Sequence, residues 1–215
     1  KGRSVLEIEL LKCNNTLEKK TCLIYLSKNL LCIESQIEFI DNNVDEKILL
    51  IDNMIQEVTH SNKTKEDLAA LICKFIREIT EFDRVYYCEF QEDGHGFVPA
   101  EDKNENTESI LYHRFPATDL PYIVRKLYTK SRFRMISDAY YEPIPIIGCT
   151  EKLDLSRSLF RDIGSSHIKY LKNMGTCASA SFSVVEGENL KGLIGCHSAT
   201  SKSISLALFP KLKTL

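Results

Sequence analysis

The sequence predicts an α+β domain in which helices flank an antiparallel β-sheet. Two amphipathic helical patterns occupy residues 44–80, and two β-rich segments that form a hairpin occupy 177–197. Short β segments between them are separated by turns rich in glycine, proline and polar residues. This order of elements favours helices on one side of an antiparallel sheet.

Composition excludes several classes of protein. The 215 residues allow one sizeable core with an N-terminal attachment. A formal net charge of −2 argues against nucleic-acid binding, which needs a concentrated basic face. Apolar runs such as 48–51 are far shorter than the ~20 residues that cross a bilayer, so we expect no membrane association. No secretory signal is visible. The sequence has no initiator Met, so we expect a fragment.

The eight cysteines form no C-x-x-C pair, so the sequence predicts no zinc ribbon, no other metal site and no thioredoxin motif. Several lie within apolar helix or strand patterns. Scattered buried thiols suit a reducing compartment, and we therefore expect a cytoplasmic protein.

The first helix is predicted over 44–59 and the second over 64–80. Thr64 and Asp67 form a capping-box pattern at the start of the second helix. The apolar stripe of the first helix is Ile48, Ile51, Ile55 and Val58, and that of the second is Leu68, Leu71, Ile72, Phe75 and Ile79.

The next segments predict short strands. Residues 84–90 are rich in β-formers and end at a glycine-containing turn over 92–96, after which 97–100 supplies a hairpin partner. Residues 101–109 are polar and predict a loop, and 132–136 predict another short strand.

A helix is predicted to start at Asp119, with the carboxylate as cap and Pro121 in the first turn. The Pro-containing stretch 138–158 has weak periodicity, which is typical of a functional loop. A further helix is predicted over 166–174, ending at Gly175.

Residues 177–185 alternate alanine, phenylalanine or valine with serine, which predicts a strand with one apolar and one hydroxyl-lined face. After the turn 186–189, residues 190–197 complete the hairpin. At the N-terminus, 4–9 predict a strand, whereas 10–43 show no sustained repeat.

The serine face indicates either solvent or a polar ligand, because buried hydroxyls need hydrogen-bond partners. His167 opens a predicted helix and His197 ends the strand paired with the serines, so both can reach one cavity. Arg134 and Arg161 carry guanidinium groups, which can bind carboxylates bidentately. These residues predict a polar-edged pocket for an anionic organic ligand.

Several segments, in this order, resemble the bilin-binding GAF domain of phytochrome-type photoreceptors. They are FDRV at 82–85, EDGHG at 92–96, HRFPATDLP at 113–121, RKLYT at 125–129, SSHIKYLKNMG at 165–175, SASFSVV at 179–185 and GLIGCH at 192–197. Each is weak alone, but together they are highly specific. The resemblance implies a GAF domain over 44–215 with a long knot-type loop, preceded over 1–43 by the end of a PAS-like domain and a connecting segment.

The resemblance also implies a cofactor, biliverdin or a related linear tetrapyrrole, and roles for individual residues. The main-chain carbonyl of Asp119 and the side chain of His167 would meet the pyrrole nitrogens, and His197 would donate to the carbonyl of ring D, the ring that rotates. Arg134 and Arg161 would bind the propionates. The remaining chromophore-binding residues would be the hydroxyls of Ser179 and Ser181, the wall residues Tyr170, Phe115 and Tyr128, and Cys88, which stands where the family usually has a tyrosine beside ring D.

Two further positions depart from the family pattern. Gly164 replaces a hydroxyl residue near a propionate, which removes a hydrogen bond worth about 1 kcal/mol. Ser166 stands where plant and cyanobacterial relatives carry the cysteine that attaches the bilin, and serine without a base is a poor nucleophile. We therefore expect the tether to lie outside the chain, with the other thiols, Cys88, Cys149 and Cys177, as alternatives.

The implied function is red/far-red light sensing in which bilin photoisomerisation switches a signal. The fragment would not be an enzyme, and a histidine kinase or other effector would lie outside it. Helix 44–59 offers a face for a homodimer. One alternative is a pigment-free GAF module for interaction, dimerisation or another small ligand. A Cys–His enzyme using Cys196 and His167 is disfavoured, because Cys196 and His197 would point to opposite faces of a strand.

Overall fold

The structure is a computed structural model. It describes residues 2–11, 17–28, 33–39, 43–143, 155, 161–205 and 207–212, with the backbone alone for the segments before residue 43.

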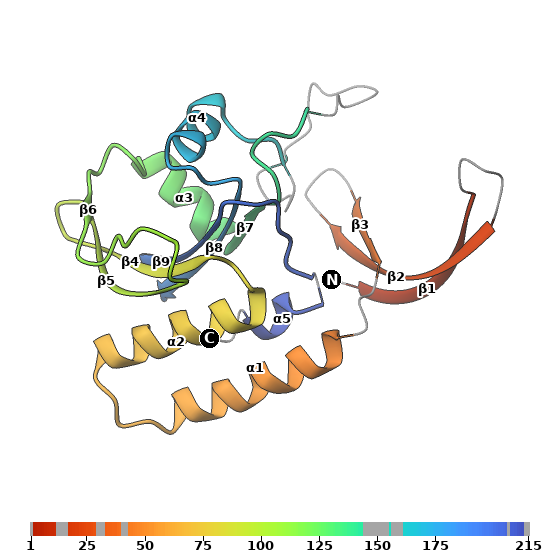
Figure 1. Cartoon of the computed structure of the whole chain (residues 1–215), viewed down its shortest axis with the longest axis horizontal. Helices are drawn as coiled ribbons and strands as arrows, with labels where there is room; N and C mark the ends of the chain where they lie inside the picture. Colours follow the sequence, from red (N-terminus) through yellow and green to blue (C-terminus); the bar gives the residue numbers. More distant parts are fainter. Residues whose placement is uncertain are drawn as a thin grey trace.

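The N-terminal segments form a three-stranded antiparallel sheet in the order β1-β2-β3, to one side of the rest of the molecule (Figure 1). Its strands are β1 (Gly2–Leu11), β2 (Leu17–Lys28) and β3 (Ile33–Phe39). The strand expected at 4–9 is confirmed within β1. The sequence did not predict β2 and β3, because the apolar run of β2, residues 22–26, does not alternate, and such runs fit a helix as well as a strand.

Two long helices follow, α1 (Val44–Thr59) and α2 (Lys65–Thr80), and both are confirmed. Thr64 caps α2 as expected, since its hydroxyl oxygen accepts from the Asp67 N–H at 3.2 Å. The buried face of α2 is wider than the expected stripe: Cys73 and Ile76 are buried, whereas most of the expected residues are half-buried. The reason is that α2 contacts both the sheet and α1, so no single stripe describes its packing.

The second sheet is antiparallel and has six strands in the order β6-β5-β4-β9-β8-β7. Its strands are β4 (Arg84–Phe90), β5 (Gly96–Lys103), β6 (Arg114–Phe115), β7 (Phe133–Ile136), β8 (Ala178–Glu186) and β9 (Asn189–Ser198). The hairpins β4–β5 and β8–β9 are joined by the pairing of β4 with β9. The last strand in sequence is therefore central in the sheet.

Helices lie on both faces of this sheet (Figure 1). The helices α1, α2 and α5 (Phe209–Leu212) cover one face, and α3 (Tyr122–Lys130) and α4 (Ser165–Asn173) cover the other. The α+β class is confirmed, but the expectation of helices on one side was wrong. The physical reason lies in the alternation of the strands, because the alanine face of β8 joins the core while its serine face also needs a cover.

The main core lies between the sheet and the helices α1, α2 and α5. Its fully buried side chains include Ile51, Ile76, Phe82, Val85 and Cys196. This core fixes one face of β4 and β9, and so also determines where their opposite face points.

Some expected boundaries were wrong. Strand β5 continues to Lys103, because Lys103 still pairs with Arg84 of β4, so the polar loop begins later than expected. Helix α3 begins after Pro121, which is its N-cap in extended conformation, and Asp119 makes no capping bond. Helix α4 and the left-handed Gly175 after it are confirmed. Most of the loop at 138–158, including Cys149, lies outside the described residues.

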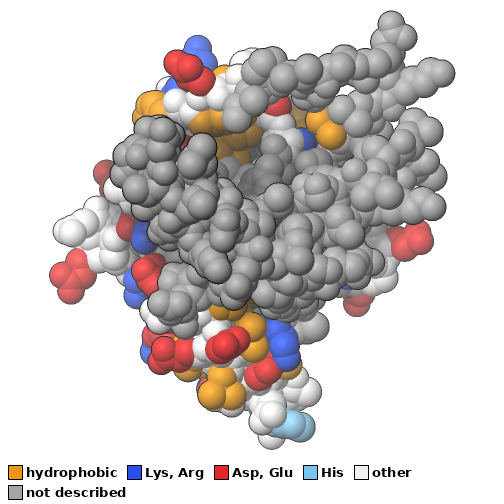
Figure 2. Space-filling view, turned by 90° about the vertical axis from the view of Figure 1, so that its right-hand side faces the viewer, with side chains coloured by type: hydrophobic (Ala, Val, Ile, Leu, Met, Phe, Trp, Pro, Cys, Tyr) orange, Lys and Arg blue, Asp and Glu red, His pale blue; other side chains and the backbone are white. Residues whose placement is uncertain are grey.

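Among the described residues of the face in Figure 2, acidic and basic side chains are interspersed at the height of α1 and α2. This mixture provides no concentrated basic patch there. Within the described ranges, no helix is both long enough and apolar enough to cross a membrane.

Candidate functional site

A pocket lies between the sheet and the helices α3 and α4, on the side away from the main core. It holds about 780 Å³ of empty space, part of it open to solvent. The expected site residues that line it are Cys88, Phe115, Asp119, Tyr128, His167, Tyr170, Ser179, Ser181 and His197. The fold thus brings together side chains from β4, β6, α3, α4, β8 and β9.

The serine face of β8 is the floor of the pocket. Ser179 pairs with His197 of β9 and Ser181 with Gly195, so the serines and His197 share one face. The Ser181 hydroxyl donates to the Tyr128 hydroxyl at 3.2 Å. Helix α3 is therefore tied to the floor by a hydroxyl pair whose atoms also border the pocket.

His197 is buried at one end of the pocket. Its Nδ1 lies 3.1 Å from Nη2 of Arg84, and its Nε2 lies 3.4 Å from the hydroxyl of Tyr86. Burial, together with the positive charge of Arg84, lowers the pKa of His197 to about 3. The imidazole is therefore neutral at physiological pH.

His167 and Tyr170 project from α4 and stack with ring centroids 6.1 Å apart. Burial lowers the pKa of His167, and the charge of Arg134 lowers it further. Asp119 lines the same pocket from a turn that is closed by its N–H donating to the Pro116 carbonyl at 3.0 Å. A histidine and a carboxylate from separate segments thus border the same cavity.

Arg134 and Arg161 do not line this pocket. Nη2 of Arg134 donates to the carbonyls of Arg161 at 2.7 Å and of Asp162 at 3.0 Å, while its Nη1 is buried with no hydrogen-bond partner among the described residues. Burial lowers the pKa of Arg134 to about 10. Arg161 borders a second cavity of about 640 Å³, together with Asp138 and Tyr141.

The thiols differ in their surroundings. Cys88 borders the pocket, and burial raises its pKa to about 12, which leaves little thiolate at neutral pH. Cys196 is fully buried in the core, on the opposite face of β9 from His197. The expectation that Cys196 and His197 point to opposite faces of the strand is thus confirmed. Ser166 is exposed on α4.

Sequence reasoning missed Arg84, Tyr86 and Gly195. Arg84 and Tyr86 lie on β4, four and two residues before Cys88. Strand alternation therefore places Arg84, Tyr86 and Cys88 on the same face, which is the face toward the pocket. The period-two pattern could have found Tyr86. The same pattern could not show that Gly195, because it has no side chain, leaves room for the Tyr86 ring.

Protein-family models give no match to this sequence. Among curated proteins, the chain is 40% identical to cyanobacterial phytochrome B of Nostoc sp. over 146 residues, which is 66% of this chain and 19% of that protein. It is 36% identical to a bacteriophytochrome of Pseudomonas aeruginosa over 157 residues, 69% of this chain and 22% of that protein. The chain therefore spans about a fifth of the length of these relatives.

Solved structures agree with the sequence comparison. The chromophore-binding domain of a bacteriophytochrome from R. palustris matches 97% of this chain and 70% of its own, with a TM-score of 0.82 and 27% identity. A longer bacteriophytochrome structure from the same source matches 97% of this chain and 43% of its own, with a TM-score of 0.87 and 25% identity. Similarity in sequence and in fold together show that this chain belongs to the phytochrome family, as part of a phytochrome photosensory module.

Proposed function

We propose that this chain senses red and far-red light through a linear tetrapyrrole, biliverdin or a related bilin, held in the pocket between the sheet and α3 and α4. One observation carries the proposal: Asp119, His167 and His197, from three separate segments, border one cavity in a chain with the fold of a phytochrome chromophore-binding domain.

The lining of the pocket fits such a group in its chemistry. Phe115 and Leu193 provide apolar walls, whereas Ser179 and Ser181 provide hydroxyls. Outside this lining, Arg134 keeps a buried N–H without a partner among the described residues. Such a group is costly to bury unless an acceptor reaches it, and a carboxylate is a suitable one.

In the proposed mechanism, the residues hold the ligand and respond to its shape. The bound bilin supplies a conjugated double bond that isomerises on absorbing light. The main-chain carbonyl of Asp119 would accept a hydrogen bond from the pyrrole N–H groups, and His167 would meet the same nitrogens. Tyr170 and Tyr128 would restrict the rings. Neutral His197 would donate a hydrogen bond to a carbonyl of the ligand. A change in these contacts biases a two-state protein.

We extend the proposal to the organisation of the protein. Residues 1–43 would be the end of a PAS-like domain and its connection, and 44–215 the GAF domain. A histidine kinase or another effector outside this chain would receive the signal, and the exposed Leu49 and Leu50 of α1 favour a homodimer through that helix. The free thiols of Cys73, Cys88, Cys177 and Cys196 are in keeping with a reducing cytoplasm.

Expression together with a source of biliverdin tests the function. We expect a protein with a visible band near the red end of the spectrum that changes on red illumination and recovers afterwards. His167→Ala should weaken or remove the band, whereas the matched change His60→Ala, at an exposed residue after α1, should not. A colourless wild-type protein would contradict the proposal and favour a pigment-free interaction module.

The same preparation shows whether the pigment is covalent. Because Ser166 replaces the attachment cysteine and Cys88 carries a raised pKa, we expect no zinc-induced fluorescence at the position of this chain on a denaturing gel. A fluorescent band that Cys88→Ser abolishes would instead identify Cys88 as the tether.

A further inference from the structure

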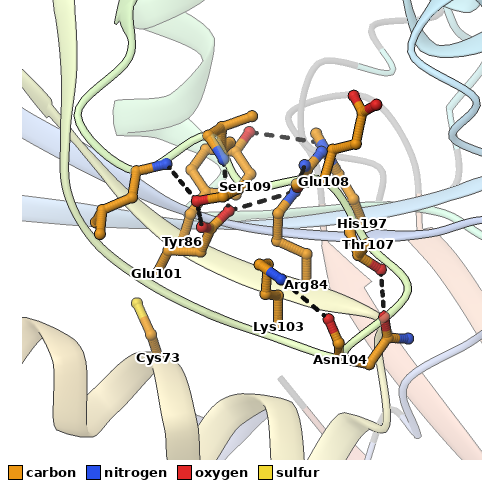
Figure 3. Close-up of polar contacts among 12 residues, drawn as sticks. Cys73, Arg84, Tyr86, Glu101, Lys103, Asn104, Thr107, Glu108, Ser109 and His197 are labelled. Atoms are coloured by element: carbon orange, nitrogen blue, oxygen red, sulfur yellow. Dashed lines mark hydrogen bonds and ion pairs between the residues drawn. The ribbon is translucent and has the colours of Figure 1, made fainter.

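Two side chains of β4 flank the imidazole of His197. Arg84 is the residue directly opposite His197 in the pairing of β4 with β9, and Tyr86 is opposite Gly195. Since Arg84 and Tyr86 are two residues apart, both project from the same face of β4 toward His197 (Figure 3). The rings of Tyr86 and His197 meet edge to face, with centroids 5.1 Å apart.

The guanidinium of Arg84 is held in place independently of the histidine. Its Nη1 donates to the Glu108 carbonyl at 2.7 Å, and its Nε lies 3.9 Å from the Glu101 carboxylate. Glu101 is itself fixed by the Ile110 N–H at 3.0 Å and by the Ser109 hydroxyl at 2.5 Å (Figure 3). With the Arg84 side chain 6% exposed, its second nitrogen has a fixed direction, toward Nδ1 of His197.

We infer that Arg84 is a positioning residue that fixes the tautomer of His197, so that Nε2 carries the proton and donates into the pocket. A guanidinium can only donate hydrogen bonds, so Nδ1 must accept with its lone pair. A neutral imidazole carries one N–H, which then must be at Nε2. The lowered pKa of His197 is in keeping with a neutral ring.

Tyr86 completes this arrangement as an acceptor for the Nε2 proton. Its hydroxyl oxygen lies 3.4 Å from Nε2, which is long for a hydrogen bond and easily exchanged for a better acceptor. Burial raises the pKa of Tyr86, so the phenol keeps its own proton. Tyr86 thus places a phenol in the pocket that Cys88 also lines.

This inference deepens the proposed function and rests on it for the identity of the ligand. A donor at Nε2 selects a carbonyl oxygen at this end of the pocket and disfavours an N–H group. With no ligand carbonyl in reach, the Tyr86 oxygen would accept the hydrogen bond from Nε2, so the histidine would keep an acceptor whether or not a ligand carbonyl is there.

The test uses the pigment-free chain, with its histidines labelled with ¹⁵N, and reads the tautomer from long-range proton–nitrogen correlation spectra. We expect His197 to be neutral and protonated at Nε2 in the wild type. Arg84→Met removes the hydrogen-bond donor but keeps a side chain of similar length. It should lower the ratio of the Nε2–H tautomer to the Nδ1–H tautomer by about tenfold or more. Arg84→Lys, which keeps a charged donor, should restore much of the ratio.

Two further variants separate the roles of the neighbours. Tyr86→Phe should keep the tautomer but let the Nε2 proton exchange with solvent several-fold faster. Arg77→Met should change neither property, because Arg77 pairs with Asp102 and does not line the pocket. Unchanged proton exchange in Tyr86→Phe would remove Tyr86 from the proposal.

A wild-type His197 protonated at Nδ1 would overturn the inference, even if the Arg84 variants fail to fold. An Arg84→Met protein with the wild-type ratio would do the same. These outcomes do not depend on pigment, so they are distinct from the colourless protein that would contradict light sensing.

Discussion

Gly195 determines how closely Tyr86 can approach the central strand β9. A Cβ added to Gly195 would lie 2.6 Å from the Tyr86 hydroxyl oxygen, far inside contact distance. Because that phenol is also the neighbour of His197, the absence of a side chain at Gly195 determines the shape of this end of the pocket.

At this scale we predict that Gly195→Ala destabilises the protein by about 1–3 kcal/mol, because the added carbon displaces a buried ring. Urea unfolding measures the loss. Gly164→Ala is the matched control: it has no neighbour within 4 Å of the added carbon and a φ of −58°, so its cost should be limited to a weaker N-cap of α4, below about 1 kcal/mol. Equal effects of the two substitutions would show that Tyr86 is not confined as described.

The elements themselves follow local rules that the sequence displays. The Thr64 hydroxyl accepts from the Asp67 N–H and donates to the Asp67 carboxylate at 2.8 Å, which satisfies the start of α2. The alternation of β8 likewise separates its core face from its serine face. Helix α3 departs from expectation because the extended Pro121 delays its start.

For α2 we predict that Thr64→Ala lowers the free energy of unfolding by about 1 kcal/mol, through the loss of its N-cap. Lys63→Ala, at the exposed residue just before the cap, is the control and should change it by less than about 0.5 kcal/mol. If chemical denaturation shows the same midpoint for both variants, the cap contributes nothing to the stability of α2.

The molecule as a whole carries a pocket bordered by two histidines, the buried His197 and the half-buried His167. The pKa of His197 is lowered from 6.5 to about 3, and the pKa of His167 is also lowered. Below pH 6.5 the His197 side chain is protonated in the unfolded chain but stays neutral in the folded chain. The free energy of unfolding therefore falls as the pH falls toward 3.

We therefore predict that unfolding free energy falls between pH 6.5 and 4.5, with His197 contributing up to about 1.4 kcal/mol for each pH unit. His197→Gln should make this dependence shallower, because it removes one of the groups that is protonated only on unfolding. His60→Gln, at an exposed position, should leave the slope as in the wild type. Parallel slopes for wild type and His197→Gln would show that His197 accepts protons in the folded state.

By itself, the sequence determined the helices α1, α2 and α4, the strands β4, β7, β8 and β9 to within a residue or two, and the residues that give the pocket its serines and histidines. These features depend on hydrophobic periodicity, helix caps and turns, and each of these is determined by residues that are close together in the sequence. The motif order also identified the family before any contact was known.

Only the tertiary structure decided that helices cover both sheet faces, that β9 lies between β4 and β8, and that Arg84 and Tyr86 flank His197. Each of these depends on pairing between strands about 110 residues apart in sequence, as in the pair Arg84 and His197. Register across such a distance is set by burial of the shared core and not by local pattern. The donor that His197 presents is therefore a property of the assembled sheet.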